Sequence, residues 1–115
     1  MKADSLAIEC STVSHQHALD MACELRRRGL FAEVVAAFWK EGPQLSAVLD
    51  GVRWPEVYIV PNFISEGYFT RTVLPREFGL EGAVTERAGR RLYYCKPVGS
   101  HPSMTSALRH RALAA

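Results

Sequence analysis

The chain has 115 residues, of which 48% are hydrophobic and 23% charged, and its formal net charge at pH 7 is +2. This length fits one domain with its own core, and the hydrophobic content argues against intrinsic disorder. So small a net charge gives no reason to expect nucleic acid or another polyanion as a partner.

No apolar run approaches the roughly 20 residues that cross a bilayer, and the amino terminus lacks a signal-peptide layout. The sequence therefore predicts a cytoplasmic protein with no membrane partner. Its three cysteines, Cys10, Cys23 and Cys95, form no CxxC pair, and their odd number argues against a disulfide framework. Cys23 is expected in the core, on a helix.

The first predicted strand runs from Ser5 to Cys10, and Glu9 places a charge where a buried strand would not carry one. A helix that ends at Gly29 follows, and Phe31 to Phe38 form the second strand. A short helix is predicted after Gly42-Pro43. The apolar positions of the two helices are Ala18, Met21, Ala22 and Leu25 in the first and Leu45, Val48 and Leu49 in the second.

The third strand, Val57 to Val60, is a continuous β-branched and aromatic run, as in a strand covered on both faces, and Pro61 marks its exit. An aromatic-rich loop, Asn62 to Arg71, comes next. A helical turn over Val73 to Phe78 and a polar connection over Glu81 to Gly89 complete this part of the chain.

The fourth predicted strand is Arg90 to Cys95, and a final helix begins at about Ser103. Its inward-facing residues are expected to be Met104, Ala107, Leu108 and Leu113. Alternation of strands and helices predicts an α/β fold with a four-stranded parallel sheet, right-handed crossovers and helices on both faces.

A flavodoxin-like strand order, 2-1-3-4, would place the first and third strands side by side at the topological switch point. In such a sheet the ligand crevice lies outside the carboxyl ends of the strands. We therefore expect Glu9 and Tyr68 to look into one hollow, with the segment from Lys96 to His101 on its far side.

Three segments resemble the CbiX family of tetrapyrrole chelatases, the sirohydrochlorin cobaltochelatases and their ferrochelatase relatives. They are the strand and loop Val60 to Arg71 running into Leu74-Pro75-Arg76, the turn Pro97 to Pro102, and the first strand with its helix. The resemblance implies a single CbiX-like chelatase domain over residues 1–115, with a flavodoxin-like fold. It also implies a homodimer, because short members of the family form the substrate cleft between two copies.

The implied reaction inserts a divalent metal, cobalt or iron, into a sirohydrochlorin-type tetrapyrrole of cobalamin or siroheme biosynthesis while the pyrrole nitrogens lose protons. The metal is thus a substrate, and no organic cofactor is expected. Such a site needs a metal ligand, a proton acceptor, and apolar walls for the macrocycle.

Two departures from the family pattern matter. Where the first strand usually ends in His-Gly-Ser, this chain has Glu9-Cys10-Ser11, and where a second metal-binding histidine commonly follows the third strand, it has Phe69. A glutamate can bind a divalent ion or take a proton, whereas Phe69 can do neither. Glu9 is therefore the predicted catalytic residue and metal ligand, with a raised pKa if it is buried beside an apolar ligand.

The predicted substrate-binding residues are Ser11, Asn62, Tyr68, Phe69, Arg71 and His101. The aromatic pair would wall the macrocycle or pack against a second copy, and Arg71, like Arg76, would pair with its carboxylates. Each role has a structural alternative. Glu9 would lean out and pair with a cation, the arginines would form surface salt bridges, and His101 would hold its turn and cap the final helix.

The remaining histidines, His15, His17 and His110, fit solvated helical positions, and Cys10 fits a small buried thiol better than a soft metal ligand. Two functions follow from these residues. The first is a CbiX-type chelatase. The second is a non-catalytic module that binds a tetrapyrrole, a metal or another protein, which the loss of both histidines favours.

Overall fold

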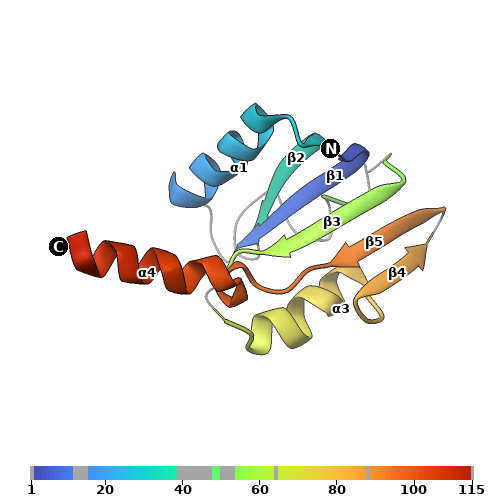
Figure 1. Cartoon of the computed structure of the whole chain (residues 1–115). Helices are drawn as coiled ribbons and strands as arrows, with labels where there is room; N and C mark the ends of the chain where they lie inside the picture. The colour runs from blue at the N-terminus through green and yellow to red at the C-terminus, as the bar shows by residue number, and fades with distance from the viewer. Residues whose placement is uncertain are drawn as a thin grey trace.

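The computed structural model describes residues 2–11, 16–38, 48–49, 54–63, 65–87 and 89–114. A five-stranded sheet runs through its centre (Figure 1). The strands are β1 (Lys2–Ser11), β2 (Phe31–Phe38), β3 (Glu56–Pro61), β4 (Val84–Arg87) and β5 (Arg90–Tyr94). The helices are α1 (Gln16–Arg28), the π-helical turn η1 (Phe69–Val73), α3 (Leu74–Phe78), the 3-10 turn η2 (Val98–Ser100) and α4 (Pro102–Ala114).

The strand order is β2-β1-β3-β5-β4, and β2, β1, β3 and β5 are parallel. The predicted α/β fold is confirmed, and the four predicted strands have the flavodoxin-like order 2-1-3-4. The short helix predicted after Gly42-Pro43 is described only at Val48 and Leu49, so its start, with Leu45, lies outside the described residues.

The sheet has one strand more than predicted, because β4 forms within the stretch expected to be a polar connection and pairs antiparallel with β5. Arg87 pairs with Arg90, and Gly89 adopts φ 76° in the turn between them, a conformation that glycine reaches without strain. An edge strand needs only one covered face. Thr85 is its buried residue, and its neighbours are exposed, which explains the polar sequence.

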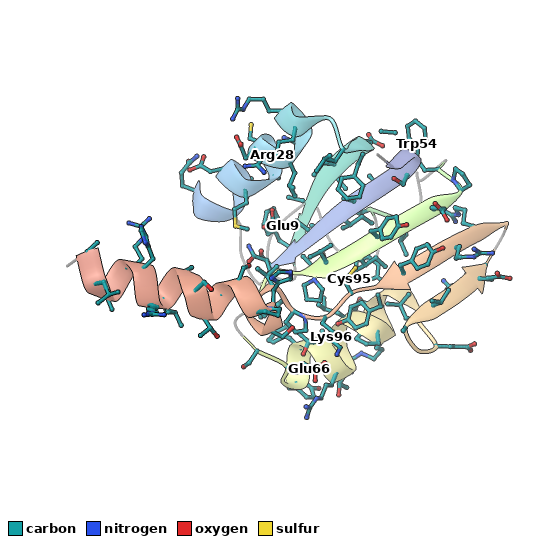
Figure 2. All side chains as sticks on the ribbon, viewed as in Figure 1. Glu9, Arg28, Trp54, Glu66, Cys95 and Lys96 are labelled. Atoms are coloured by element: carbon teal, nitrogen blue, oxygen red, sulfur yellow. The ribbon has the colours of Figure 1, made fainter. Side chains whose placement is uncertain are left out.

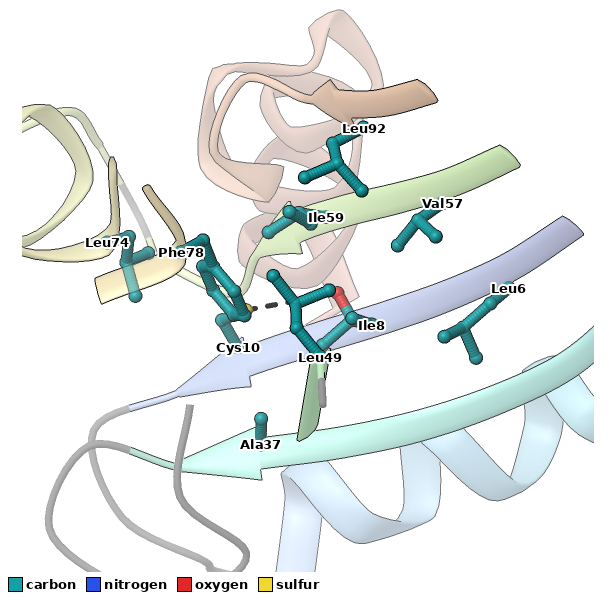
Figure 3. Packing of buried hydrophobic residues seen from close by; sticks show 10 residues of the cluster. All are labelled: Leu6, Ile8, Cys10, Ala37, Leu49, Val57, Ile59, Leu74, Phe78 and Leu92. Atoms are coloured by element: carbon teal, nitrogen blue, oxygen red, sulfur yellow. Dashed lines mark hydrogen bonds between the residues drawn. The ribbon is translucent and has the colours of Figure 1, made fainter. Parts of the chain in front are cut away.

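The sheet is covered on both faces by helices packed on apolar clusters. On the α1 face, the cluster consists of Ala7, Ala22, Val34, Ala36 and Phe38. On the opposite face, shown in Figure 3, it consists of Leu6, Ile8, Cys10, Ala37, Leu49, Val57, Ile59, Leu74, Phe78 and Leu92. Alternate residues of β1 therefore serve the two layers, as the pleat of a strand requires.

The final helix, α4, is not packed as predicted. It projects beyond the carboxyl ends of the strands (Figures 1 and 2), and Leu108 and Leu113 are 68% and 77% exposed. Only Met104 among its residues is partly buried. The inward-facing positions were wrong because helical spacing shows which residues share a side and not whether a surface lies beneath them.

Cys23 is also misplaced by the sequence analysis, because it is exposed on α1. Ala22 and Leu25 face the sheet in its place, and Arg26 Nε donates to the carbonyl oxygen of Val34 at 2.8 Å. None of the described helices is both long and apolar enough to cross a bilayer.

The core ring of Phe78 gives the first prediction. It is 1% exposed between α3 and the sheet (Figure 3), so Phe78→Ala should lower the free energy of unfolding by about 3–5 kcal/mol through lost burial and a residual cavity. Urea denaturation followed by circular dichroism measures the change. Leu113→Ala on exposed α4 is the control and should cost less than about 0.5 kcal/mol; equal losses would contradict the packing described for α3.

Candidate functional site

The three segments singled out in the sequence meet at the carboxyl edge of the sheet. The Asn62 N–H donates to the carbonyl oxygen of Cys10 at 2.8 Å, which joins the end of β3 to the end of β1. The Gly99 N–H donates to the carbonyl oxygen of Phe63 at 2.9 Å, which joins the turn after β5 to the loop after β3. Residues far apart in the sequence therefore form one continuous edge.

Glu9 lies on the α1 face of this edge and is 5% exposed (Figure 2). Its carboxylate oxygen Oε1 accepts hydrogen bonds from Asn62 Nδ2 at 2.9 Å and from Ser11 Oγ at 3.3 Å. A carboxylate removed from water needs such donors, because burial without them is costly. The alternative in which Glu9 leans out to pair with a surface cation does not fit this buried position.

Asn62 and Ser11 thus touch the candidate catalytic carboxylate itself. Asn62 Nδ2 also lies 3.8 Å from the thioether sulfur of Met21, so α1 packs beside this group. The sequence analysis assigned Met21 only an apolar helical position. Nothing in its spacing distinguishes a methionine beside a carboxylate from one in the core.

Cys10 points to the opposite face of the sheet from Glu9 and is fully buried. Burial raises the pKa of its thiol well above the ordinary range, and the nearby charges of Glu9 and then Cys95 add to this shift. The thiol therefore stays protonated at neutral pH, and its position fits the structural reading better than that of a metal ligand.

An aromatic group lies at the start of the loop's helical part. The rings of Phe63 and Phe69 stack with centroids 5.9 Å apart, and Tyr68 meets Phe69 edge to face at 6.3 Å. Tyr68 is 66% exposed, so the outer side of the group faces solvent. Phe63 and Phe69 are nearly parallel, at 16°, whereas Tyr68 stands at 73° to Phe69, so an apolar ligand here would meet both ring faces and ring edges.

The backbone beneath this group is a π-helical turn, Phe69–Val73. Gly67 and Thr70 fix its entry, because the Gly67 N–H donates to Thr70 Oγ1 at 2.8 Å and the Arg71 N–H donates to the Gly67 carbonyl oxygen at 2.9 Å. The hydroxyl of Tyr94 donates to the Thr70 carbonyl oxygen. Such turns are rare and occur often at functional sites.

Thr70 and Tyr94 were missed as site-forming residues, since neither carries a recognisable motif. Burial raises the pKa of Tyr94, so its hydroxyl remains a donor at neutral pH. Arg71 is exposed and pairs with Glu66 at 3.2 Å. This contact is the surface salt bridge weighed as the alternative, and it leaves the guanidinium accessible at the rim of the loop.

His101 lies at the start of α4 and its ring nitrogen Nδ1 accepts from the Ser103 N–H at 3.1 Å. The same nitrogen is 2.8 Å from Ser103 Oγ. This geometry matches the capping role, and its substrate-binding role stays a prediction. His15 lies outside the described residues, as does the side chain of His17, and His110 is exposed on α4.

Glu9 and the aromatic group share the carboxyl edge but approach it from different sides of the sheet. Glu9 faces α1, whereas Phe63 packs against the cluster beneath α3 and carries Phe69 with it. Within the described ranges, no set of three or more His, Cys, Asp or Glu side chains is placed to hold a metal ion. The common hollow expected for Glu9 and Tyr68 stays a prediction.

The model of the CbiX family matches residues 12–115 of this chain. The chain belongs to the CbiX family. The match begins just after the triplet Glu9-Cys10-Ser11, so the position where the family's histidine was expected lies outside it. The matched part includes the loop after β3, the turn after β5 and α4.

Two relatives show how this CbiX domain occurs in longer proteins. The chain is 40% identical over 116 residues to a Halobacterium salinarum protein named "probable sirohydrochlorin cobaltochelatase". The alignment includes 86% of this chain but only 40% of that protein. The chain superposes with a TM-score of 0.85 and 36% identity on DR2241 of Deinococcus radiodurans, a multi-domain protein with structural similarity to chelatases. This superposition includes 96% of the present chain and 28% of DR2241.

The contact between Asn62 and Glu9 gives the second prediction. Asn62→Asp replaces a donor with a second carboxylate, and two carboxylates at hydrogen-bond distance cannot both ionise without a penalty. The variant should lose stability relative to wild type as the pH rises from acidic to neutral, because shared protonation is then lost. Thermal unfolding across this pH range measures the difference, and Asn62→Ala is the control, whose loss should grow less with pH because it removes a donor without adding a second carboxylate. A pH-independent loss in both variants would contradict the contact.

The cysteines give a third prediction. At pH 8 a thiol reagent should modify the exposed Cys23 and leave the buried Cys10 unmodified, because burial both shields that thiol and raises its pKa. Cys95, half-buried and also with a pKa raised by burial, should react more slowly than Cys23. Peptide mass spectrometry after timed labelling of the native protein gives the order. Full labelling in urea is the control, and early modification of Cys10 would show that the core is open.

Proposed function

We propose that this CbiX-family protein is a chelatase that inserts cobalt or ferrous iron into a sirohydrochlorin-type tetrapyrrole. The proposal rests on the buried Glu9 carboxylate, placed by Asn62 and Ser11 at the end of the central strand β1. The Halobacterium relative, named a probable sirohydrochlorin cobaltochelatase, supports the reaction and supports cobalt as the metal. Because the chain spans less than half of that relative, its own activity has to be tested directly.

Metal insertion requires that a divalent cation approach the macrocycle while two pyrrole protons leave. Glu9 supplies a carboxylate that can receive one of these protons or bind the incoming cation, since a hard oxygen ligand suits divalent ions. Asn62 orients that carboxylate by donating to Oε1. Asn62 is therefore a positioning residue in this proposal.

The aromatic group and Arg71 would hold the macrocycle. Tyr68 and Phe69 offer ring faces at the carboxyl edge, and the exposed guanidinium of Arg71 can exchange Glu66 for a carboxylate of the tetrapyrrole. An exposed ion pair contributes little to stability, so the exchange would cost little. A second copy of the chain would close the cleft over this group, as in the short CbiX proteins that the sequence resembles.

The alternative is a binding module that holds a tetrapyrrole without inserting metal. It is favoured by the donor set, because the two family histidine positions carry Glu9 and Phe69, and the described residues do not gather three metal-ligating side chains. A single carboxylate is a weak site for cobalt or iron, for which imidazole is a better ligand.

Glu9→Gln separates the two functions. Wild-type protein should accelerate the absorbance change of sirohydrochlorin with Co²⁺ over a protein-free control, and Glu9→Gln should lose about a hundredfold or more of that acceleration, because an amide cannot take the proton. Glu81→Gln, an exposed carboxylate after α3, is the matched control and should keep the wild-type rate.

Tetrapyrrole binding is measured in parallel by fluorescence quenching. If wild type binds the tetrapyrrole but metallates no faster than the protein-free control, the chelatase proposal is wrong and the binding module remains. If Glu9→Gln metallates at the wild-type rate, Glu9 has no part in the reaction.

A further inference from the structure

One carbonyl group of the π-helical turn η1 has no donor from the helix itself. The carbonyl oxygen of Thr70 would accept from the N–H of residue 74 in an α-helix and from that of residue 75 in a π-helix. The Leu74 N–H donates instead to the Phe69 carbonyl oxygen, and residue 75 is a proline, which has no N–H. Thr70 is only 4% exposed, so its carbonyl needs a donor from another part of the chain.

Tyr94 supplies that donor from β5. Its hydroxyl donates to the Thr70 carbonyl oxygen, although the two residues lie 24 positions apart in the sequence. The ring of Tyr94 packs against the apolar cluster beneath α3, so the side chain points to the face of the sheet on which the turn lies. A side-chain donor on β5 therefore takes the place of the backbone donor that Pro75 lacks.

The turn determines where the aromatic group lies, because Tyr68 and Phe69 stand at its start. Phe69 stacks on Phe63, with ring centroids 5.9 Å apart. Phe63 is held by a separate contact, since its carbonyl oxygen accepts from the Gly99 N–H in the turn after β5. The stacked pair thus depends on two contacts, one that fixes Phe63 and one that fixes the turn carrying Phe69.

A second hydrogen-bonding register is open to this turn. If the Leu74 N–H moved to the Thr70 carbonyl, an α-helical bond would satisfy that carbonyl without Tyr94. The change would remove one residue from the wide turn. Since successive residues of an α-helix lie about 100° apart around its axis, Tyr68 and Phe69 would rotate by about that angle and leave Phe63. The Tyr94 hydroxyl favours the observed register, because it satisfies the acceptor that the second register would use.

We propose that Tyr94 is a positioning residue of the candidate site: its hydroxyl holds the π-helical turn in the register that stacks Phe69 on Phe63 and leaves Tyr68 exposed. Tyr94 acts through Thr70 and not by touching the ligand. The consequence for tetrapyrrole binding rests on the proposed function. The consequence for the rings does not, so the two can be tested separately.

The first test needs no ligand. Tyr94→Phe removes the hydroxyl and keeps the ring, and it should abolish the nuclear Overhauser contacts between the rings of Phe63 and Phe69 that the wild-type protein shows. Tyr93→Phe is the matched control. It removes the hydroxyl that donates to Glu56, from the neighbouring position on β5, and should leave the ring contacts unchanged. Ring contacts that persist in Tyr94→Phe would overturn the proposal.

The second test asks whether Tyr94 replaces the donor missing at Pro75. Pro75→Ala restores a backbone N–H at that position, so Thr70 no longer depends on the hydroxyl. The decrease in melting temperature caused by Tyr94→Phe should therefore shrink by about half or more when Pro75→Ala is also present. Equal decreases in the two backgrounds would show that the hydroxyl and the proline are unrelated, and would contradict the proposal.

The third test measures binding of metal-free sirohydrochlorin by fluorescence quenching. Tyr94→Phe should raise the Kd about tenfold, because only molecules with correctly placed rings bind. In the metallation assay KM should rise with it, while kcat stays within about twofold of wild type. Tyr93→Phe should keep the wild-type Kd, and an unchanged Kd in Tyr94→Phe would overturn the positioning role. A wild-type protein that binds no tetrapyrrole would refute the proposed function, and the first two tests would still decide the role of Tyr94 in the turn.

Discussion

The hydrogen bond from Asn62 to Glu9 joins two residues 53 positions apart, and the candidate site depends on it. A carboxylate between a sheet and a helix is tolerated only with donors directed at it, and Asn62 provides one from the adjacent strand. The backbone of the same residue continues the β1–β3 ladder through Cys10. The start of the aromatic loop is therefore fixed by the contacts that stabilise the buried charge.

This arrangement explains why a glutamate can occupy the position that the family resemblance assigns to histidine. An imidazole accepts at one nitrogen and donates at the other, whereas a carboxylate only accepts, so its neighbours must be donors. Asn62 and the Ser11 hydroxyl both meet that need. The candidate site consequently has a carboxyl group on the α1 side of the sheet and aromatic rings on the α3 side.

Much of the fold followed from the sequence because buried parallel strands leave a strong pattern. The apolar runs of β1, β2 and β3 and the helical spacing of α1 predicted the central layers and the flavodoxin-like order, and the charge of Glu9 within an apolar strand pointed to the site. β4 was missed because an edge strand has one covered face and reads as a polar connection. Met21 and Tyr94 were missed because their roles come from neighbours distant in sequence.

The prediction of which residues of α4 face inward was wrong for a different reason. Leu113 lies on the opposite side of α4 from Met104, so the four residues expected to face inward do not share one side, and only Met104 among the residues of α4 is partly buried.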